Sequence, residues 1–149
     1  MRFTAIAALL LAAVASAQSS SFSNCVTAAA DMTVTSFSLS PDPVCVGQNY
    51  CINVTGTLSA PVVTGAKLVV TGRWSGHIVY TDNQDFCTVL AASGRPCPVP
   101  ITTTSLSLCV LMKPTYPANV PLALTILATN GNGNVLFCQA ATVIPQNCS

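Results

Sequence analysis

The sequence has very little charge and a single histidine. Only 6% of its 149 residues are Asp, Glu, Lys or Arg, whereas 51% are hydrophobic. Five Lys and Arg side chains cannot form the basic face that binds nucleic acid, so we expect no nucleic-acid partner. A disordered chain would combine low hydrophobicity with high charge, and a coiled coil would be rich in Glu and Lys. Both classes are therefore excluded.

Residue patterns that carry catalysis or bind metal are also scarce. A nucleophilic triad needs an imidazole with an orienting acid, and the only candidate is His77, whose context Trp74-Ser75-Gly76-His77 favours a strand end or bend. Asp82 and Asp85 fall in a polar segment, which favours solvated loop residues over an acid–base pair. No Cys-x-x-Cys motif suggests zinc. We therefore predict no enzyme, no metal site and no cofactor.

A long apolar run occurs only at the N-terminus. Arg2 precedes an apolar stretch at 5–15, and Ala15-Ser16-Ala17 supplies the small residues of a cleavage site. The run is too short for a good transmembrane span. The sequence thus predicts a signal peptide at residues 1–17 and a single exported domain at 18–149, a length that allows one hydrophobic core.

The cysteines indicate an oxidising compartment. All eight lie after the predicted signal peptide: Cys25, Cys45, Cys51, Cys87, Cys97, Cys109, Cys138 and Cys148. An even number in an exported chain indicates a disulfide framework, although the count leaves the pairing open. Asn53-Val54-Thr55 is an N-glycosylation motif, so we expect a glycan on Asn53.

Alternation of apolar and polar residues dominates the exported part. Tyr50, Ile52 and Val54 alternate with polar residues that include Asn53, which predicts a strand with Asn53 on its wet face. The same period of two runs through 67–74, 105–112, 122–126 and 135–139, and more weakly through 32–39, where a bulge is possible. Asn-Gly pairs at 130–134 predict a hairpin. No segment of a dozen residues shows a helical stripe, so we predict an all-β antiparallel β-sandwich of about seven short strands.

The surplus of apolar residues has two interpretations. It can fill a thick core, or it can line a cavity for an apolar ligand. Several disulfides, each contributing about 2–4 kcal/mol, would tolerate an incompletely filled core. Composition alone leaves the two interpretations nearly even.

Landmarks along the whole exported part carry a family resemblance. They are Ser23-Asn24-Cys25, Pro43-Val44-Cys45 with Cys51, Ile52-Asn53-Val54-Thr55, Cys87 with Gly94-Arg95-Pro96-Cys97-Pro98, Lys113-Pro114-Thr115-Tyr116-Pro117 and Leu136-Phe137-Cys138. In this order and spacing the chain resembles the ML-domain lipid-recognition family, which includes soluble Niemann-Pick type C sterol-transfer proteins and fungal phosphatidylglycerol/phosphatidylinositol transfer proteins. The resemblance implies an immunoglobulin-like sandwich with a lipid cavity between its sheets.

The resemblance also implies a disulfide pairing. The family's three-bridge pattern would join Cys25 to Cys138, Cys45 to Cys51, and Cys87 to Cys97. By remainder, Cys109 and Cys148 would form a fourth bridge that holds the C-terminus.

The resemblance implies a ligand entrance between two segments of the chain. The candidate lipid-binding residues are Ile78, Val79 and Tyr80 in the first segment, and Met112 and Tyr116 in the second. For each of them, the alternative is core packing or a surface loop. Trp74 favours packing, and Lys113 fits either a lipid headgroup contact or a solvated loop.

The implied function is a carrier that takes one lipid from a membrane and releases it elsewhere. We expect a sterol first and an anionic phospholipid second, transient membrane contact, a monomer, and a location outside the cell or in the vacuole or lysosome lumen. The competing hypothesis is a secreted adhesion-type sandwich with a filled core.

Overall fold

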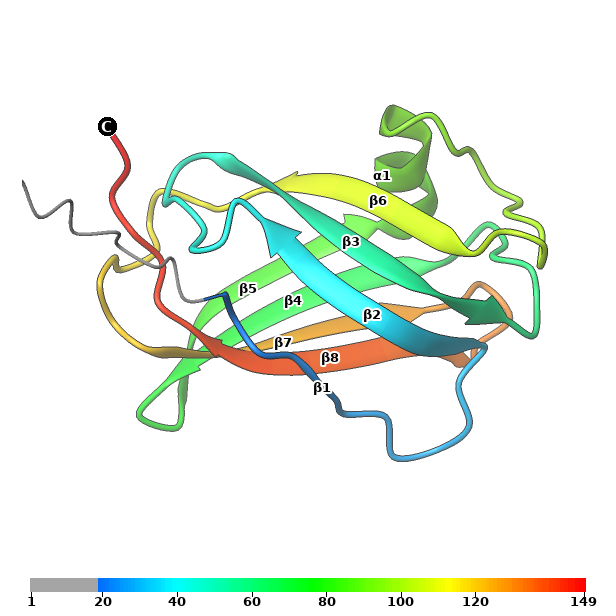
Figure 1. Cartoon of the computed structure of the whole chain (residues 1–149), viewed down its shortest axis with the longest axis horizontal. Coiled ribbons are helices and arrows are strands. Elements are labelled where there is room, and N and C mark those ends of the chain that lie inside the picture. The colour runs from blue at the N-terminus through cyan, green and yellow to red at the C-terminus, as the bar shows by residue number, and fades with distance from the viewer. Residues whose placement is uncertain (1–18) are drawn as a thin grey trace, which may run out of the picture.

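The computed structural model describes residues 19–149, so the predicted signal peptide lies outside the described residues. Two antiparallel sheets face each other (Figure 1). The larger sheet has the order β1-β8-β7-β4-β5, with β1 at Ser23–Asn24, β8 at Val135–Val143, β7 at Leu122–Thr129, β4 at Lys67–Trp74 and β5 at His77–Asp85. The smaller has the order β2-β3-β6, with β2 at Met32–Ser40, β3 at Asn49–Leu58 and β6 at Ser105–Leu111. The predicted immunoglobulin-like β-sandwich is confirmed.

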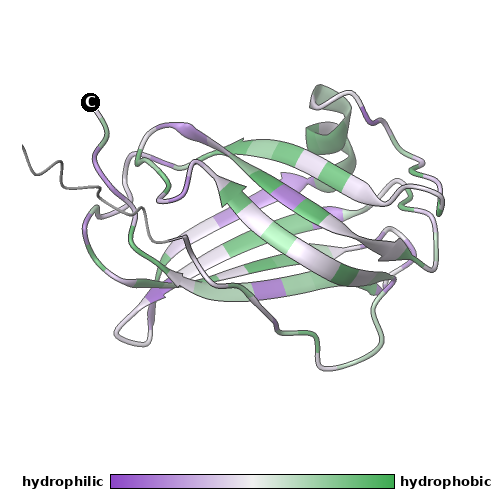
Figure 2. Cartoon of the chain, viewed as in Figure 1, coloured by the Kyte–Doolittle hydropathy of each residue, from purple (hydrophilic) through white to green (hydrophobic). Residues whose placement is uncertain are grey.

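The period of two decides which side chains enter the core. In β3, Tyr50, Ile52 and Val54 are all at most 1% exposed, whereas Asn53 lies on the opposite face, as predicted. Figure 2 shows apolar and polar residues alternating along β3. The largest fully buried side chains come from both sheets and from α1: Tyr50, Phe86, Phe137, Ile52, Leu68, Leu90, Leu106, Leu108, Met112, Leu122, Leu124 and Ile126. The core therefore lies between the two sheets.

The hairpin of β4 and β5 has a tight turn and one irregularity. Ser75 and Gly76 both have positive φ, 49° and 80°, which suits a two-residue hairpin loop. Gly72 pairs with Tyr80 while Arg73 pairs with Ile78, so Val79 is an extra residue in β5. The predicted bend at this position is confirmed.

Two sequence interpretations of the following segment were wrong. The polar segment 81–85 is not a loop, because β5 continues through Asp85. Asp82 faces inward and is only 4% exposed, so it is not a solvated loop residue. Asp85 accepts a hydrogen bond from the Thr88 backbone N–H at 2.7 Å and thereby caps a short helix, α1 (Phe86–Ala92), which sequence periodicity did not reveal.

Two of the expected disulfides are present and two are wrong. Cys25–Cys138 and Cys87–Cys97 are confirmed. Cys51 does not pair with Cys45 but with Cys109, because these two residues lie directly opposite each other in the ladder between β3 and β6. Cys45 pairs instead with Cys148, so the expected Cys109–Cys148 bridge is also wrong. The C-terminal segment pairs with the β2–β3 loop, where the Val46 backbone N–H donates to the Gln146 carbonyl at 2.9 Å.

Candidate functional site

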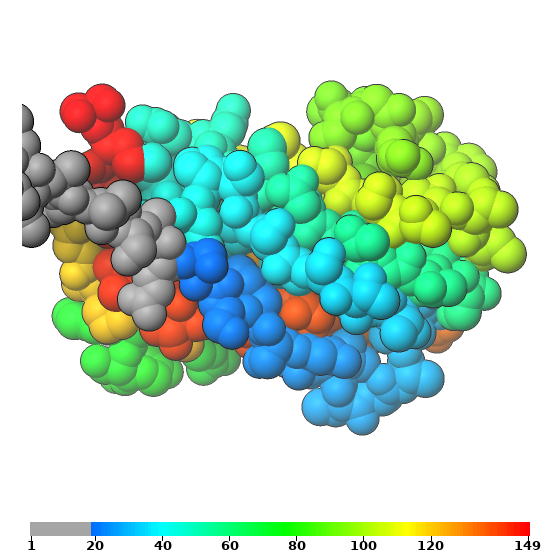
Figure 3. Space-filling model, viewed as in Figure 1, coloured from blue at the N-terminus to red at the C-terminus, as the bar shows by residue number. Residues whose placement is uncertain are grey.

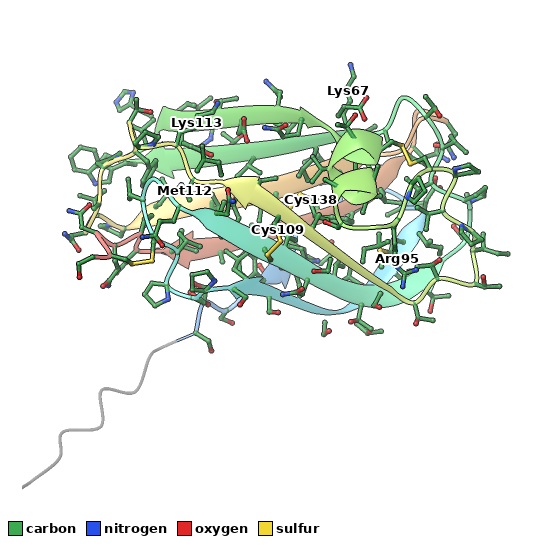
Figure 4. The ribbon with its side chains drawn as sticks, turned by 90° about the horizontal axis from the view of Figure 1, so that it is seen from above. Lys67, Arg95, Cys109, Met112, Lys113 and Cys138 are labelled. Atoms are coloured by element: carbon green, nitrogen blue, oxygen red, sulfur yellow. A yellow bond between two sulfur atoms is a disulfide. The ribbon has the colours of Figure 1, made fainter. Side chains whose placement is uncertain are left out.

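The two sheets meet without backbone pairing along one side of the sandwich. β5 is the edge strand of the larger sheet, and β6 is the edge strand of the smaller one. At one end α1 packs against both strands and buries Phe86, Val89 and Leu90. At the other end the chain that follows β6 lies beside β5, and Figure 4 shows Met112 and Lys113 there, opposite Arg95. Along this edge, side-chain contacts therefore hold β5 to the end of β6 and the chain after it at this second end.

Six side chains gather at this end and form what we call the tyrosine–lysine cluster. Its members are Tyr50 of β3, Tyr80 and Asp82 of β5, and Met112, Lys113 and Tyr116 of the segment after β6. The backbone of Met112 fixes that segment, because its N–H donates to the Gln48 carbonyl at 2.9 Å and its carbonyl accepts from the Gly47 N–H at 2.8 Å. Met112 itself is fully buried.

Aromatic contact joins the two sides of the cluster. The rings of Tyr80 and Tyr116 lie edge to face with their centroids 5.5 Å apart, a favoured geometry for aromatic pairs. The Tyr80 hydroxyl donates a long hydrogen bond of 3.4 Å to the Leu111 carbonyl. Tyr80 of β5 therefore contacts Tyr116 through its ring and the last residue of β6 through its hydroxyl.

Lys113 makes the charged contact between the same two segments. Its Nζ lies 3.0 Å from Asp82 Oδ1 and donates to the Thr81 carbonyl at 3.0 Å. The Asp82 side chain is 5% exposed and the Lys113 side chain 45% exposed, so the carboxylate is buried beneath the lysine. Gln84 Nε2 donates to Asp82 Oδ2 at 3.0 Å, so both carboxylate oxygens have partners. The cluster therefore carries one positive and one negative charge, already in contact.

Two hydroxyls in the cluster have no such partner. Tyr50 is 1% exposed and Tyr116 3% exposed, and neither hydroxyl is hydrogen-bonded to any group of residues 19–149. Burial, with smaller contributions from Tyr80 and Asp82, raises the pKa of Tyr50 far above its ordinary value of 10.0. Burial also raises the pKa of Tyr80 and of Tyr116 to about 12. All three phenols therefore keep their protons at neutral pH.

The structure brings together only part of the set that the resemblance implied. Tyr80, Met112 and Tyr116 are buried in the tyrosine–lysine cluster, whereas Ile78 and Val79 are 56% and 38% exposed on the β4–β5 hairpin. Lipid contact by any of the five stays a prediction. Sequence reasoning missed the roles of Tyr50 and Asp82, although two signals were present. Tyr50 begins the alternation of β3, and the period of two continues from Tyr80 through Asp82 to Gln84.

Exposed apolar side chains surround this end of the molecule. Trp74, which the sequence favoured as a packing residue, is 47% exposed at the end of β4. Ile78 and Val79 follow it across the hairpin turn. Leu111 is 46% exposed and lies next to Tyr80, whose hydroxyl donates a hydrogen bond to the Leu111 carbonyl. The charged and aromatic contacts of the cluster therefore lie next to an apolar surface.

Hollows among residues 19–149 lie away from the tyrosine–lysine cluster. One of about 200 Å³ is at the other edge of the sandwich, near the strip in Figure 3 where β8 shows between the segment before β2 (blue) and β2 itself (cyan). It is lined by Asn24, Val26, Ala28, Ala30, Met32, Thr33, Val34 and Phe137. A second hollow, of about 320 Å³, is lined by four residues with polar side chains, Lys67, Asn83, Gln84 and Asp85. Small-molecule pockets typically measure about 300–1,000 Å³ and are mostly apolar, so neither hollow fits a lipid well.

The described residues give no sign of a metal site. Among residues 19–149, no group of three or more His, Cys, Asp or Glu side chains could hold a metal ion. Within the same residues, no helix is long and apolar enough to cross a membrane.

Comparisons with known proteins agree with this architecture. The structure is similar to that of a Niemann-Pick type C2 protein from the Japanese carpenter ant, with a TM-score of 0.65 and 14% identity over 85% of this chain and 99% of that one. It is also similar to chicken MD-1 in complex with lipid IVa, with a TM-score of 0.50 and 12% identity over 83% of this chain and 87% of that one. No curated protein matches the sequence. A family model described as ML domain matches residues 19–144, and the chain therefore belongs to the ML-domain family.

Proposed function

We propose that this protein binds a single lipid between its two sheets and transfers it between membranes. The observation that carries the proposal is the tyrosine–lysine cluster. There, two sheet edges with a largely apolar core behind them are joined only by side-chain contacts. The family assignment supports it, as does the similarity to an MD-1 protein solved with lipid IVa.

Apolar burial provides the driving force in this proposal. Separation of Lys113 from Asp82 and of Tyr80 from Tyr116 would open a path from solvent to Met112 and the core. An entering lipid returns about 25 cal/mol for each Å² of apolar surface that it removes from water. Opening along the β5–β6 edge also requires the hydrogen bonds from Tyr80 to the Leu111 carbonyl and from Lys113 to the Thr81 carbonyl to break.

The exposed apolar residues beside the cluster supply the proposed membrane contact. Trp74, Ile78 and Val79 project from one hairpin, and indole side chains favour the interface between water and lipid. Contact there would place the tyrosine–lysine cluster against the bilayer, so that a lipid could pass without crossing water.

The charges of the cluster favour a sterol over an anionic phospholipid. Lys113 is the one cation in the cluster and already contacts Asp82, so no uncompensated positive charge is available to a phosphate group. Transfer of phosphatidylglycerol or phosphatidylinositol is the alternative within the same function.

The proposal also includes export from the cytoplasm. Disulfides persist in oxidising compartments, so four of them support a location outside the cell or in the lumen of the vacuole or lysosome. We expect the protein to act there as a monomer. Asn53, which accepts from the Ser107 hydroxyl at 2.8 Å on the outer face of the smaller sheet, would carry a glycan. The function requires no bond to be made or broken, and hence no catalytic group.

Native mass spectrometry of protein purified from its source tests the proposal. We expect a co-purifying lipid, and uptake of cholesterol by delipidated protein from donor vesicles. A bare protein mass together with no uptake of either cholesterol or phosphatidylglycerol would overturn lipid transfer.

One observation favours a second function. The side chains between the sheets, including Ile52, Leu108 and Met112, are completely buried, as expected for a filled core. A secreted interaction module needs no more than this. The same experiment separates the two, because such a module would take up no lipid.

A further inference from the structure

The two unpartnered tyrosine hydroxyls are the least expected feature of the core. Buried hydroxyls are nearly always hydrogen-bonded, because burial without a partner loses their bonds to water. Among residues 19–149, only the hydroxyls of Tyr50 and Tyr116 are buried side-chain polar atoms without a partner. Phenylalanine would fill nearly the same volume without this cost, so the hydroxyls call for an explanation outside the fold.

Both hydroxyls belong to the end where the sheets can part. Tyr50 pairs with Val110 in the ladder between β3 and β6, two residues before Met112, and Tyr116 packs against Tyr80. The other polar groups of the cluster are satisfied. Lys113 contacts Asp82 and Thr81, Gln84 binds Asp82, and Tyr80 binds Leu111. Only Tyr50 and Tyr116 therefore retain hydrogen-bonding capacity in an otherwise apolar surrounding.

We propose that the Tyr50 and Tyr116 hydroxyls bind one uncharged oxygen, a hydroxyl or a carbonyl, at one end of an otherwise apolar ligand. This inference rests on the proposed lipid-binding function and names its ligand class. Protonated phenols can donate to such an oxygen and can also accept from a hydroxyl. The rest of the ligand lies among the apolar side chains behind Met112.

The electrostatics of the cluster exclude a charged headgroup from this position. Asp82 is buried close enough to raise the pKa of both Tyr50 and Tyr80, and the same negative charge repels a phosphate or carboxylate. Lys113 does not offset this repulsion, because it is already engaged with Asp82. An uncharged oxygen meets no such penalty.

The test compares two ligands with the same steroid carbon skeleton, of which only one carries an oxygen. Cholesterol carries a 3-hydroxyl and cholestane lacks it, and both can be offered to delipidated protein as cyclodextrin complexes. We expect wild type to prefer cholesterol, and we expect Tyr50→Phe and Tyr116→Phe each to reduce cholesterol affinity by about three- to tenfold. Cholestane affinity should change by less than about twofold in both variants, because only a hydrogen-bonding partner is lost.

Stability without ligand gives a second, independent readout. Tyr50→Phe and Tyr116→Phe remove a hydroxyl that has no partner, so both should raise the melting temperature of the delipidated protein. Tyr80→Phe is the matched control, because its hydroxyl has the Leu111 carbonyl as a partner and its removal should lower the melting temperature.

Each contrary outcome has a definite meaning. Cholesterol affinity unchanged in both variants, or equal losses for cholesterol and cholestane, would overturn the oxygen site while leaving lipid binding intact. A lower melting temperature in both delipidated variants would also overturn it, because the hydroxyls would then have structural partners. Wild-type protein that binds neither cholesterol, cholestane nor phosphatidylglycerol would overturn the proposed function and this inference with it.

Discussion

Two aspartates are buried at opposite ends of the sandwich, and they are held in different ways. Asp31, 6% exposed, precedes β2, whereas Asp82, 4% exposed, lies in β5. Asp31 accepts from the side-chain amides of Asn130, Asn132 and Asn134, at 2.8, 2.8 and 3.1 Å. Asp82 has one lysine and one glutamine.

The contacts around the two aspartates also differ. At the Asp31 end the side chain of Asn130 also donates to the Pro61 carbonyl and accepts from the Val63 N–H, so three loops are joined by hydrogen bonds. At the Asp82 end the sheets are joined by a half-exposed lysine and by aromatic contact. The Asp31 end is therefore fixed by a dense network of side-chain hydrogen bonds. Near Asp82 a few side-chain contacts hold β5 to the end of β6, and the covalent link between the sheets is the Cys45–Cys148 disulfide, which joins the β2–β3 loop to the chain after β8.

The largest effect should follow from removal of the Asp31 carboxylate. Asp31→Ala leaves three amide groups without their acceptor, so we expect a loss of about 3 kcal/mol in the free energy of unfolding. Urea unfolding measures it. Asp82→Ala should cost clearly less, because Lys113 can turn to water. Equal losses in the two variants would contradict the difference between the ends.

The pH dependence of stability should reveal the same difference. Burial raises the pKa of Asp31, but the hydrogen bonds from Asn130, Asn132 and Asn134 together lower it by more than burial raises it. The pKa of Asp31 in the folded protein therefore lies below its ordinary value of 3.8. The folded-state pKa is thus below the unfolded one. The stabilisation is complete above about pH 4 and is lost as pH falls through the folded pKa. Melting curves from pH 7 to 2 should show a steeper acid loss for wild type than for Asp31→Asn.

Substitution of two methionines, one at each end, should have effects of intermediate size. Met112 lies at the tyrosine–lysine cluster, and Met32, 3% exposed, lies at the Asp31 end. Trp at either position overpacks the core, at a cost of about 1–3 kcal/mol. We expect Met112→Trp alone to abolish uptake of a fluorescent sterol by folded, delipidated protein. Unchanged uptake in Met112→Trp, or an equal loss in Met32→Trp, would place the lipid path elsewhere.

At Lys113, a loss of stability should accompany a change in the rate of lipid exchange. Lys113→Met leaves the buried Asp82 carboxylate without its cation and with Gln84 as its remaining side-chain donor, so the free energy of unfolding should fall by about 1–3 kcal/mol. Lipid exchange with vesicles should become several times faster, because one of the contacts that join the sheets is lost. Lys67→Met, at the other end of β4, is the matched control. Slower exchange in Lys113→Met would mean that the lysine recruits lipid.

The smallest effect is expected at Asn53. Asn53→Gln removes the glycosylation motif on the outer face of β3, so the secreted protein should lose the mass of one glycan while lipid uptake stays unchanged. Mass spectrometry and the sterol uptake assay measure both. Loss of uptake in a folded variant would contradict a purely external position for Asn53.

Local patterns in the sequence predict the sandwich well. Alternation placed Tyr50, Ile52 and Val54 inside β3 because an apolar face repeats every second residue, whatever the strand pairs with. It failed at 81–85, where no large apolar residue alternates with the polar ones, although the strand continues. α1 was not predicted, because a helix of 7 residues is too short to show an apolar stripe with helical periodicity.

Features that depend on pairing between distant strands were not accessible in this way. Cys51 and Cys109 each alternate with buried residues of their own strands, but only the register of β3 and β6 brings them opposite each other. Likewise, burial of Tyr50 follows from alternation, whereas the lack of a partner for its hydroxyl depends on every segment that packs around it. Such features need the tertiary structure.

The Cys45–Cys148 disulfide determines how the sandwich can widen. It covalently joins the loop between β2 and β3 of the smaller sheet to the chain that follows β8 of the larger sheet. The sheets cannot move apart at this point, so a widening movement must be a rotation whose axis passes near the disulfide. Displacement then grows with distance from that axis across the larger sheet, from β8 through β7 and β4 to β5. In the proposed widening, the edge strand that carries Tyr80 and Asp82 would therefore travel furthest.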